Sequence, residues 1–192
     1  MAELKLPVSE KTARGLSVGD FVELSGRMIT GRDAAHKWLM EGHRDEVAPY
    51  LKDSVIYHCG PVIGKNEEGS YEFVAAGPTT SIREEPYQAD VIRRYGLRGV
   101  IGKGGMGAKT LDGLARSGAV YLHAVGGAAQ VLARAIPRVE KVFMLEEFGV
   151  PEALWVIEVE RFPVMVTMDS HGGSLHDQVE ESSRAKLKEL LG

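Results

Sequence analysis

Residues 98–125 read RGVIGKGGMGAKTLDGLARSGAVYLHAV, and this stretch decides the fold class. It opens with a β-branched run at 98–101 and closes with an apolar run at 119–125, both typical of strands buried on both faces. Between them, residues 110–117 have a helical pattern, with Thr110 expected as the N-cap and Gly118 as the stop. A strand, a helix and a second strand in succession predict an α/β domain.

The rest of the chain extends this pattern in both directions. Further strands are expected at 20–24, 54–57, 71–76, 139–145, 154–159 and 164–168, and further helices at 32–42, 127–135 and 179–191. Thr30 and Asp33 fit a capping pattern, so Thr30 is expected to cap the helix at 32–42. Strands dominate the first third and alternate with helices after residue 80. We therefore expect one mixed α/β domain over residues 1–192, with mixed sheet layers and flanking helices.

Composition excludes several classes of function. The net charge is −4 and no block of Lys or Arg occurs, so no nucleic-acid partner is expected. No apolar run approaches the ~20 residues of a membrane span, and the N-terminus lacks a signal-peptide pattern, so no membrane partner and a cytoplasmic location are expected. The single cysteine, Cys59, excludes an internal disulfide and a zinc or iron-sulfur site built from this chain's thiolates alone. No metal ligand is assigned to the chain.

The stretch 77–83, GPTTSIR, concentrates hydrogen-bond donors in one loop. A Gly-Pro turn ends the strand at 71–76, and three hydroxyl side chains and Arg83 follow. If a helix starts there, its free amides point at the same place and favour an anion, although Pro86 is expected to limit such a helix to a short turn. Arg83 can bind a carboxylate through two N–H groups. A hydroxyl-rich cap with a surface arginine is the structural alternative.

Two further segments carry positive charge. Lys103 lies among glycines in IGKGGMG at 101–107, where bare backbone can approach a ligand closely. In RDAAHK at 32–37, Arg32 is expected in the first turn of a helix, with His36 one turn later on the same face. A flexible loop and a solvated helix face are the alternatives. Together the three segments predict a site for a small anion, either a diacid or a single phosphate.

Five motifs together resemble a known family. They are RDAAHK at 32–37, YHCGPV at 57–62, GPTTSxR at 77–83, IGKGGM at 101–106 and PEALWVIEVERFP at 151–163. From about residue 4 to residue 177 the chain resembles the C-terminal domain of class I fumarate hydratases, or the separate beta subunit of two-subunit forms. The beta subunits of L-tartrate dehydratase and of mesaconase-type enzymes are close relatives of that family.

The resemblance implies a swivelling β/β/α domain and a lyase that adds water to, or removes it from, a dicarboxylic acid. It implies an alpha-subunit partner that holds a four-iron, four-sulfur cluster through three cysteines, in an alpha2-beta2 assembly. Fumarate and malate are the expected substrates, with tartrate or mesaconate as alternatives. A non-catalytic dicarboxylate-binding module and a purely structural domain remain as other classes. If the partner forms the other wall of the site, the surface beside it should be apolar.

The resemblance also implies roles for single residues. Six residues of the loops and the helix start are expected to bind the carboxylates and the hydroxyl of the substrate. They are Arg32, Thr80, Ser81, Arg83, Lys103 and Gly104. Thr79 is the candidate catalytic base, and His36 is a second candidate for proton transfer because imidazole titrates near neutral pH. A threonine hydroxyl needs a charged neighbour to act as a base. Relatives often continue with Met-Asp after the arginine, whereas this chain has Glu84 and Glu85.

Overall fold

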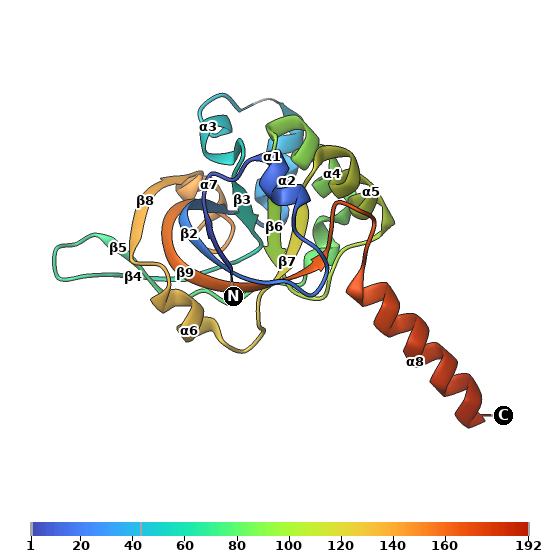
Figure 1. Ribbon diagram of the computed structural model, residues 1–192. Coiled ribbons are helices and arrows are strands. Elements are labelled where there is room, and N and C mark those ends of the chain that lie inside the picture. The colour runs from blue at the N-terminus through green and yellow to red at the C-terminus, as the bar shows by residue number, and fades with distance from the viewer. Residues whose placement is uncertain (1, 43, 192) are drawn as a thin grey trace.

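Figure 1 shows the computed structural model of the protein, which describes residues 2–42 and 44–191. The strands are β1 (Ala2–Lys5), β2 (Phe21–Thr30), β3 (Val55–Tyr57), β4 (Val62–Lys65), β5 (Tyr71–Ala75), β6 (Gly99–Gly102), β7 (Val120–His123), β8 (Arg138–Phe143) and β9 (Leu154–Met168). The helices are α1 (Glu10–Arg14), α2 (Asp33–Glu41), α3 (Ala48–Leu51), the 3₁₀ helix η1 (Ser81–Glu84), α4 (Glu85–Tyr95), α5 (Ala108–Ser117), α6 (Ala129–Arg134), α7 (Leu145–Phe148) and α8 (Leu175–Leu191).

One large mixed sheet organises the chain. Its strand order is β1-β2-β3-β6-β7-β9-β8, and β2 also pairs with β9, so β2, β3, β6, β7 and β9 close into a ring. The pairs β2–β3, β3–β6 and β6–β7 are parallel, whereas β9 runs antiparallel to β2, β7 and β8. Strands β4 and β5 form a separate hairpin. The predicted α/β class, with a mixed sheet and flanking helices, is confirmed.

Strand β9 is continuous where the sequence predicted two strands at 154–159 and 164–168. Leu24 pairs with Phe162 and Gly26 with Val159, so the register of β2 and β9 shifts between these pairs. Gly26 and Arg161 take positive φ angles of 115° and 49° at this shift. Such a β-bulge bends a strand without ending it, and the long strands can therefore curve around the core.

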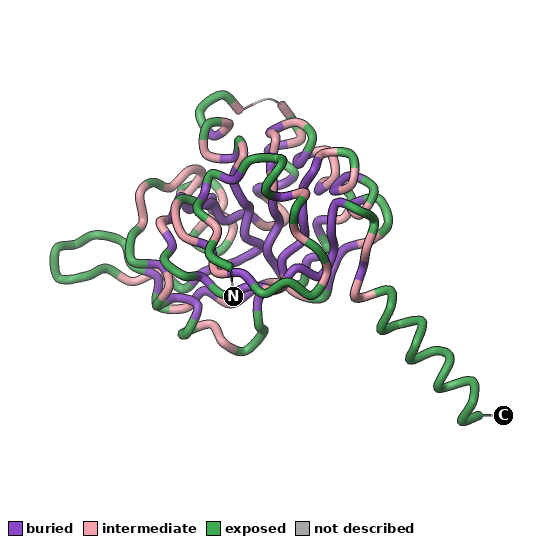
Figure 2. Tube along the Cα trace, in the orientation of Figure 1, coloured by how far each residue is buried: buried purple, intermediate pink, exposed green. Residues whose placement is uncertain are grey.

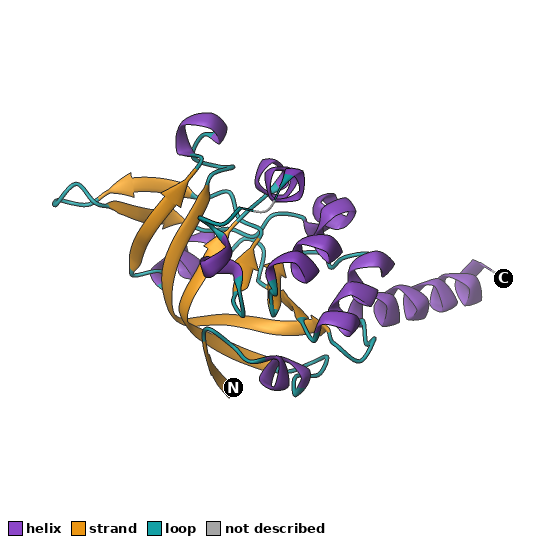
Figure 3. Cartoon of the chain, turned by 90° about the horizontal axis from the view of Figure 1, so that it is seen from above, coloured by secondary structure: helices purple, strands orange, loops and turns teal. Residues whose placement is uncertain are grey.

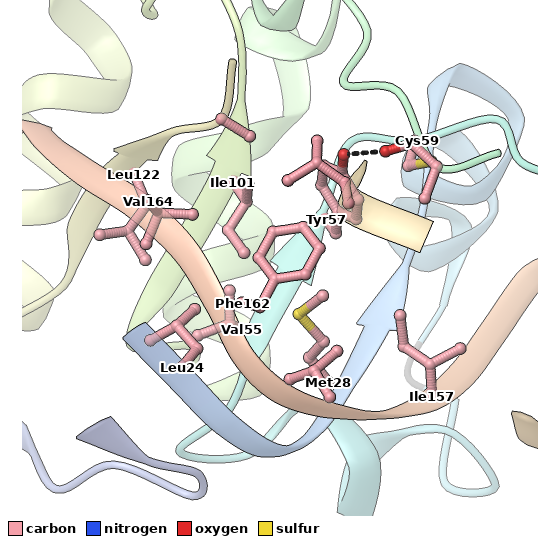
Figure 4. Close-up of a cluster of buried hydrophobic side chains, with 14 of the residues drawn as sticks. Leu24, Met28, Val55, Tyr57, Cys59, Ile101, Leu122, Ile157, Phe162 and Val164 are labelled. Atoms are coloured by element: carbon pink, nitrogen blue, oxygen red, sulfur yellow. Dashed lines mark hydrogen bonds between the residues drawn. The ribbon is translucent and has the colours of Figure 1, made fainter. Parts of the chain in front are cut away.

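Apolar side chains fill both sides of the sheet. Inside the ring, the rings of Tyr57 and Phe162 stack edge to face 5.3 Å apart (Figure 4). The Tyr57 hydroxyl donates to the carbonyl oxygen of Ala76, which ties the end of the β4–β5 hairpin to this core. On the outer face, α2, α4 and α5 pack against β3, β6 and β7 through a second buried cluster that includes Leu39 and Ile92. Seen from above, these helices lie along one side of the strands (Figure 3).

Two predicted helix caps are wrong. Thr30 is the last residue of β2, and its hydroxyl accepts the backbone N–H of Trp155 at 3.0 Å, so it bonds to β9 and not to a helix. The N-cap of α2 is Arg32, which makes no side-chain cap bond. Helix α5 begins at Ala108, which places Thr110 within its first turn. The predicted stop at Gly118 is confirmed by its left-handed φ of 63°.

Helix α4 was not expected at its full length. Pro86 was predicted to restrict any helix there to a short turn, but the helix runs from Glu85 to Tyr95. Pro86 lies in its first turn, where the missing N–H has no partner within the helix in any case. Proline therefore helps to start this helix.

Helix α8 extends away from the body of the molecule, and none of its residues is buried (Figure 2). It includes the predicted helix at 179–191 and starts four residues earlier. Within residues 2–42 and 44–191, we find no helix that is both long and apolar enough to span a membrane.

The first prediction tests the ring core. Phe162→Ala should lower the free energy of unfolding by about 3–5 kcal/mol, because a buried aromatic ring leaves a cavity when it is removed. Chemical denaturation followed by circular dichroism measures this change. Leu187→Ala on exposed α8 is the control and should shift stability by less than about 0.5 kcal/mol. Equal effects of the two substitutions would show that the ring interior does not carry the fold.

Candidate functional site

The polar segments predicted from the sequence lie at one edge of the sheet. Strands β2, β3 and β6 run parallel, so their carboxyl ends meet at the same edge. Arg32 comes two residues after β2, His58 follows β3 and Lys103 follows β6. The backbone N–H of His58 donates to the carbonyl oxygen of Ile101 at 2.8 Å and fixes two of these ends together.

The hydroxyl-rich loop lies between two of the strand ends. The N–H of Thr79 donates to the carbonyl of His58 at 2.8 Å, and the N–H of Lys103 donates to the carbonyl of Thr79 at 3.2 Å. The N–H of Ser81 donates back to the carbonyl of Lys103 at 3.0 Å. The loops at 77–83 and 101–107 are therefore adjacent, as their similar donor content suggested.

Both arginines of the site already have carboxylate partners. The guanidinium of Arg83, with 44% of its side chain exposed, lies 2.9 Å from a carboxylate oxygen of Asp33. The guanidinium of Arg32 lies 3.2 Å from Glu152, which precedes β9. Arg83 is therefore the more exposed of the two arginines, and acidic neighbours hold both guanidinium groups in place.

The helix N-termini at this edge are occupied by carboxylates of the protein. Glu152 accepts the N–H of Ala34 in the first turn of α2 at 3.0 Å. Glu85 accepts the N–H of Gly107 at 2.8 Å and that of Thr110 at 3.1 Å at the start of α5. These contacts satisfy amides that would otherwise be free to bind an anion. They also give Glu85 a structural role.

A buried hydrogen-bond network lies in the protein interior next to this edge of the sheet. The side-chain amide of Gln88, on α4, lies between His36 and His58, 2.9 Å and 2.8 Å from their Nε2 atoms. The Nδ1 atom of His58 lies 2.8 Å from the hydroxyl of Ser81, which also accepts the Tyr121 hydroxyl at 2.9 Å. All five side chains are fully buried. The network therefore connects α2, α4 and β7 to the hydroxyl-rich loop.

Both histidines of the network are uncharged. Burial lowers the pKa of His36 and lowers that of His58 well below its ordinary value. The Nδ1 of His36 lies 2.9 Å from the carbonyl of Arg32 and must donate to it, so Nε2 of the neutral ring is an acceptor. Nε2 of His36 then accepts a hydrogen bond from Gln88 when the NH₂ of the Gln88 amide faces the histidine. His36 thus holds the backbone of Arg32.

The predicted site residues separate into exposed and buried groups. Thr80 and Gly104 are exposed, and Thr79 is half-buried with its hydroxyl donating to the carbonyl of His58 at 3.1 Å. Ser81, predicted to bind substrate, and His36, predicted to transfer protons, have no exposed surface. Their predicted roles stay predictions, but the contacts that the structure shows for them are internal.

Glycine is required at two positions of the Lys103 loop. A Cβ atom on Gly102 would lie 1.9 Å from the hydroxyl oxygen of Ser81, so only glycine lets β6 pass the buried network. Gly104 has a φ of +83°, which glycine adopts without strain. A cavity of about 470 Å³ opens beside Gly104, between His123 and His176.

Glu84 is a buried residue that no sequence pattern marked as titratable. Its side chain has no exposed surface, and neither carboxylate oxygen has a hydrogen-bond partner among the described residues. The Nδ1 of His58 lies 4.0 Å away and the guanidinium of Arg83 lies 3.9 Å away. Burial, followed by the charge of Asp33, raises the pKa of Glu84 to about 7, although Arg83 opposes the change. The burial of Glu84 depends on packing between segments that are distant in sequence, so no local pattern could have identified it.

The lone cysteine does not fit an iron-sulfur cluster. Cys59 is fully buried, and burial raises the pKa of its thiol to about 12. A cluster ligand must be a thiolate. The donor set of the described residues therefore does not fit the cluster that the family resemblance implies.

The fold and the site together define an α/β domain with three cationic side chains, Arg32, Arg83 and Lys103, at one edge of its sheet. The chain belongs to the family described as Fumarase C-terminus, which matches residues 2–179. This confirms the family expected from the five motifs.

Curated relatives carry two kinds of name. The chain is 54% identical to a "Putative fumarate hydratase class I" of Geobacillus stearothermophilus, over 97% of this chain and 36% of that protein. It is 40% identical to a "Putative L(+)-tartrate dehydratase subunit beta" of Methanocaldococcus jannaschii, over 96% of each chain. It is 37% identical to the "L(+)-tartrate dehydratase subunit beta" of Escherichia coli, over 90% of this chain and 85% of that one. The chain thus spans about a third of the first relative and most of the other two.

The second prediction concerns pH and Glu84. The folded chain keeps the Glu84 proton up to about pH 7, whereas the unfolded chain releases it near the ordinary pKa of 4.5. The stability linked to this proton is fully present below the lower value and is lost as the pH rises to the higher one. Relative to Glu84→Gln, the free energy of unfolding of the natural chain should fall by roughly 2–3 kcal/mol over this range.

Urea denaturation at several pH values provides the measurement. Glu72→Gln removes an exposed carboxylate from β5 and serves as the matched control, which should follow the natural chain. If Glu84→Gln follows the natural chain as well, Glu84 is ionised in the folded protein and the buried, protonated carboxyl is refuted.

Proposed function

We propose that the chain is the beta subunit of a hydro-lyase that interconverts a 2-hydroxy dicarboxylate and its unsaturated product. The observation that carries the proposal is the position of Arg32, Arg83 and Lys103 around the hydroxyl-rich loop at one sheet edge. Membership of a family that includes proteins named fumarate hydratase and tartrate dehydratase supports it. Fumarate and malate are our first choice of substrate, and tartrate is the second, since both names occur among the relatives.

The cationic side chains suit the chemistry of this reaction. Dehydration removes a weakly acidic proton from the carbon next to a carboxylate and expels hydroxide. Negative charge then builds up on that carboxylate, and preorganised cations stabilise it. In our proposal Arg83 and Arg32 each bind a carboxylate through their planar guanidinium groups. Lys103 supplies a point charge from the adjacent loop.

Thr79 is the proposed site of proton transfer at the reacting carbon. Its hydroxyl donates to the backbone carbonyl of His58, which leaves the lone pairs of the oxygen free to face a substrate. A carbonyl cannot take the hydroxyl proton away, so Thr79 needs an ionised group to activate it. Since His58 and His36 are buried and neutral, we assign that group to the partner chain.

The partner is proposed to be a cluster-bearing alpha subunit that covers the site. An apolar groove of about 320 Å³ lies beside the edge, and its lining includes Phe21, Val125 and Val131, which are 59%, 62% and 60% exposed. Apolar surface of this kind is typical of permanent interfaces. The first relative is almost three times as long as the aligned region, which leaves room for such a unit within one chain. An alpha2-beta2 assembly is the arrangement that we expect, in the cytoplasm.

A non-catalytic module that binds dicarboxylates is the second candidate. The paired arginines favour this module, because guanidinium groups are suited to bind anions. None of the site residues assigned here could carry out the dehydration without a partner. The two candidates differ in one respect: a hydro-lyase requires a partner that completes the site, whereas a binding module does not.

The third prediction separates these functions. The chain purified alone should show no dehydration of malate or tartrate, and turnover should appear when an alpha-type partner is purified with it under anaerobic conditions. Absorbance of the unsaturated diacid measures turnover across a panel of fumarate, tartrate and mesaconate. Turnover by the chain alone would contradict the division of the site between two chains. A complete complex that binds diacids without turnover would favour the binding module.

The fourth prediction concerns Arg83 in the assembled enzyme. Arg83→Ala should lower kcat/KM by about 10- to 100-fold, because a charge-assisted contact to a carboxylate is worth roughly 1.5–3 kcal/mol. Arg83→Lys should recover little, since lysine lacks the planar pair of donors. Arg93→Ala, which removes an exposed arginine of α4, is the matched control and should retain activity. Full activity of Arg83→Ala would make this arginine a surface group without a role.

A further inference from the structure

Glu84 needs an explanation beyond its place in the fold. A buried carboxyl without hydrogen bonds is costly, and most buried polar groups in proteins are paired. Its neighbour Glu85 caps a helix, but Glu84 makes no comparable contact in the described part of the chain. Its carboxyl group lies directly behind Arg83, at the candidate site.

Charged and titratable groups face Glu84 from every element packed around it. They are Arg83 of η1, His58 after β3, Arg32 and Asp33 at the start of α2, and Tyr121 of β7. Burial keeps His58 and Tyr121 uncharged, because it lowers the pKa of the imidazole and raises that of the phenol. The arginines and Asp33 therefore determine the electrostatics around Glu84.

A count of charges shows what ionisation of Glu84 would do. The cations at the edge are Arg32, Arg83 and Lys103. Three carboxylates lie among them: Asp33 and Glu152 pair with the arginines, and Glu85 accepts amides at the start of α5 and keeps its charge. With Glu84 protonated, these cations and carboxylates balance. Ionisation of Glu84 adds one negative charge, which opposes the binding of a diacid.

The position of Arg83 gives the ionisation of Glu84 a second effect. An ionised Glu84 would lack hydrogen bonds in the interior, and the guanidinium of Arg83 lies only 3.9 Å away. A small turn of the arginine would supply the missing bonds and remove its N–H groups from the solvent side. Asp33, at 2.9 Å, holds the same guanidinium toward solvent when Glu84 is neutral.

On the basis of the proposed function, we propose that Glu84 is a positioning residue for diacid binding. Its protonated form keeps Arg83 available to a substrate carboxylate, and its ionised form draws Arg83 inward. Glu84 acts through Arg83 and exchanges its proton with solvent, so it takes no part in bond making at the substrate.

Linkage gives the sign of the effect. A diacid bound at Arg83 adds negative charge near Glu84 and strengthens the hold of Glu84 on its proton. By reciprocity, loss of that proton weakens diacid binding by the same factor. The Kd and KM for a diacid should therefore rise as the pH increases above about 7, the value to which burial raises the pKa of Glu84. The kcat should change little, because the bound complex keeps the proton.

The test is calorimetric titration of L-malate into the complex of the chain with its alpha partner, at about pH 6 and about pH 8.5. The Kd of the natural protein should rise at least about tenfold between these values, as one buried charge near the ligand requires. Glu84→Gln and Glu84→Met should both remove the dependence, and far-UV circular dichroism checks their folding. Glu72→Gln, which removes an exposed carboxylate, should retain it.

The outcomes separate this inference from the proposed function. A pH-independent Kd in the natural protein, or an unchanged pH dependence in folded Glu84 variants, overturns the role of Glu84 even if the enzyme turns over malate. A pH-dependent Kd that both variants abolish supports that role even if no turnover is found, in which case the hydro-lyase proposal fails alone. Absence of binding of both L-malate and tartrate at both pH values overturns both.

Discussion

The antiparallel pairing of β2 with β9 is the contact on which the candidate site depends. It closes the ring of strands, and the bulge opposite Gly26 lets both strands curve around the core. At the end of the pairing, the hydroxyl of Thr30 accepts the N–H of Trp155. This contact brings Glu152, just before β9, to the first turn of α2, where it binds both an amide and Arg32. A core contact thereby sets the position of a surface arginine.

The sequence was informative where a single segment determines its own structure. Buried strands such as β6 and β7 have continuous apolar runs, and Gly118 ends α5 as a left-handed residue should. Closure of the ring was not predictable, because a bulge leaves no periodic signal and joins residues over a hundred positions apart. The cap assigned to Thr30 failed for the same reason: its hydrogen-bond partner comes from β9. Pro86 misled because its effect depends on whether it begins a helix or interrupts one.

The site was predictable in its exposed half only. Motifs and family resemblance pointed to the cations and the hydroxyl-rich loop, because each of these segments has a recognisable local pattern. The supporting network joins His36, His58, Ser81 and Tyr121 through Gln88, which is distant in sequence from His36 and His58. No spacing rule links such residues, so nothing marked Gln88 in advance. Glu84 is a single acidic residue with no local signal of burial, because its burial is a tertiary property.

In the proposed enzyme, the arrangement of charges makes this edge suitable as half of an active site. Its arginines already pair with Asp33 and Glu152, and its helix N-termini are occupied by carboxylates. Binding of a diacid at this edge is therefore an exchange of carboxylates, and at a guanidinium that is 44% exposed such an exchange gains little free energy. The same contacts become strong once water is excluded. The buried network holds the cations in place, and in the proposed complex a second protein surface covers them. We therefore propose that closure by a partner, and not the edge alone, provides the affinity.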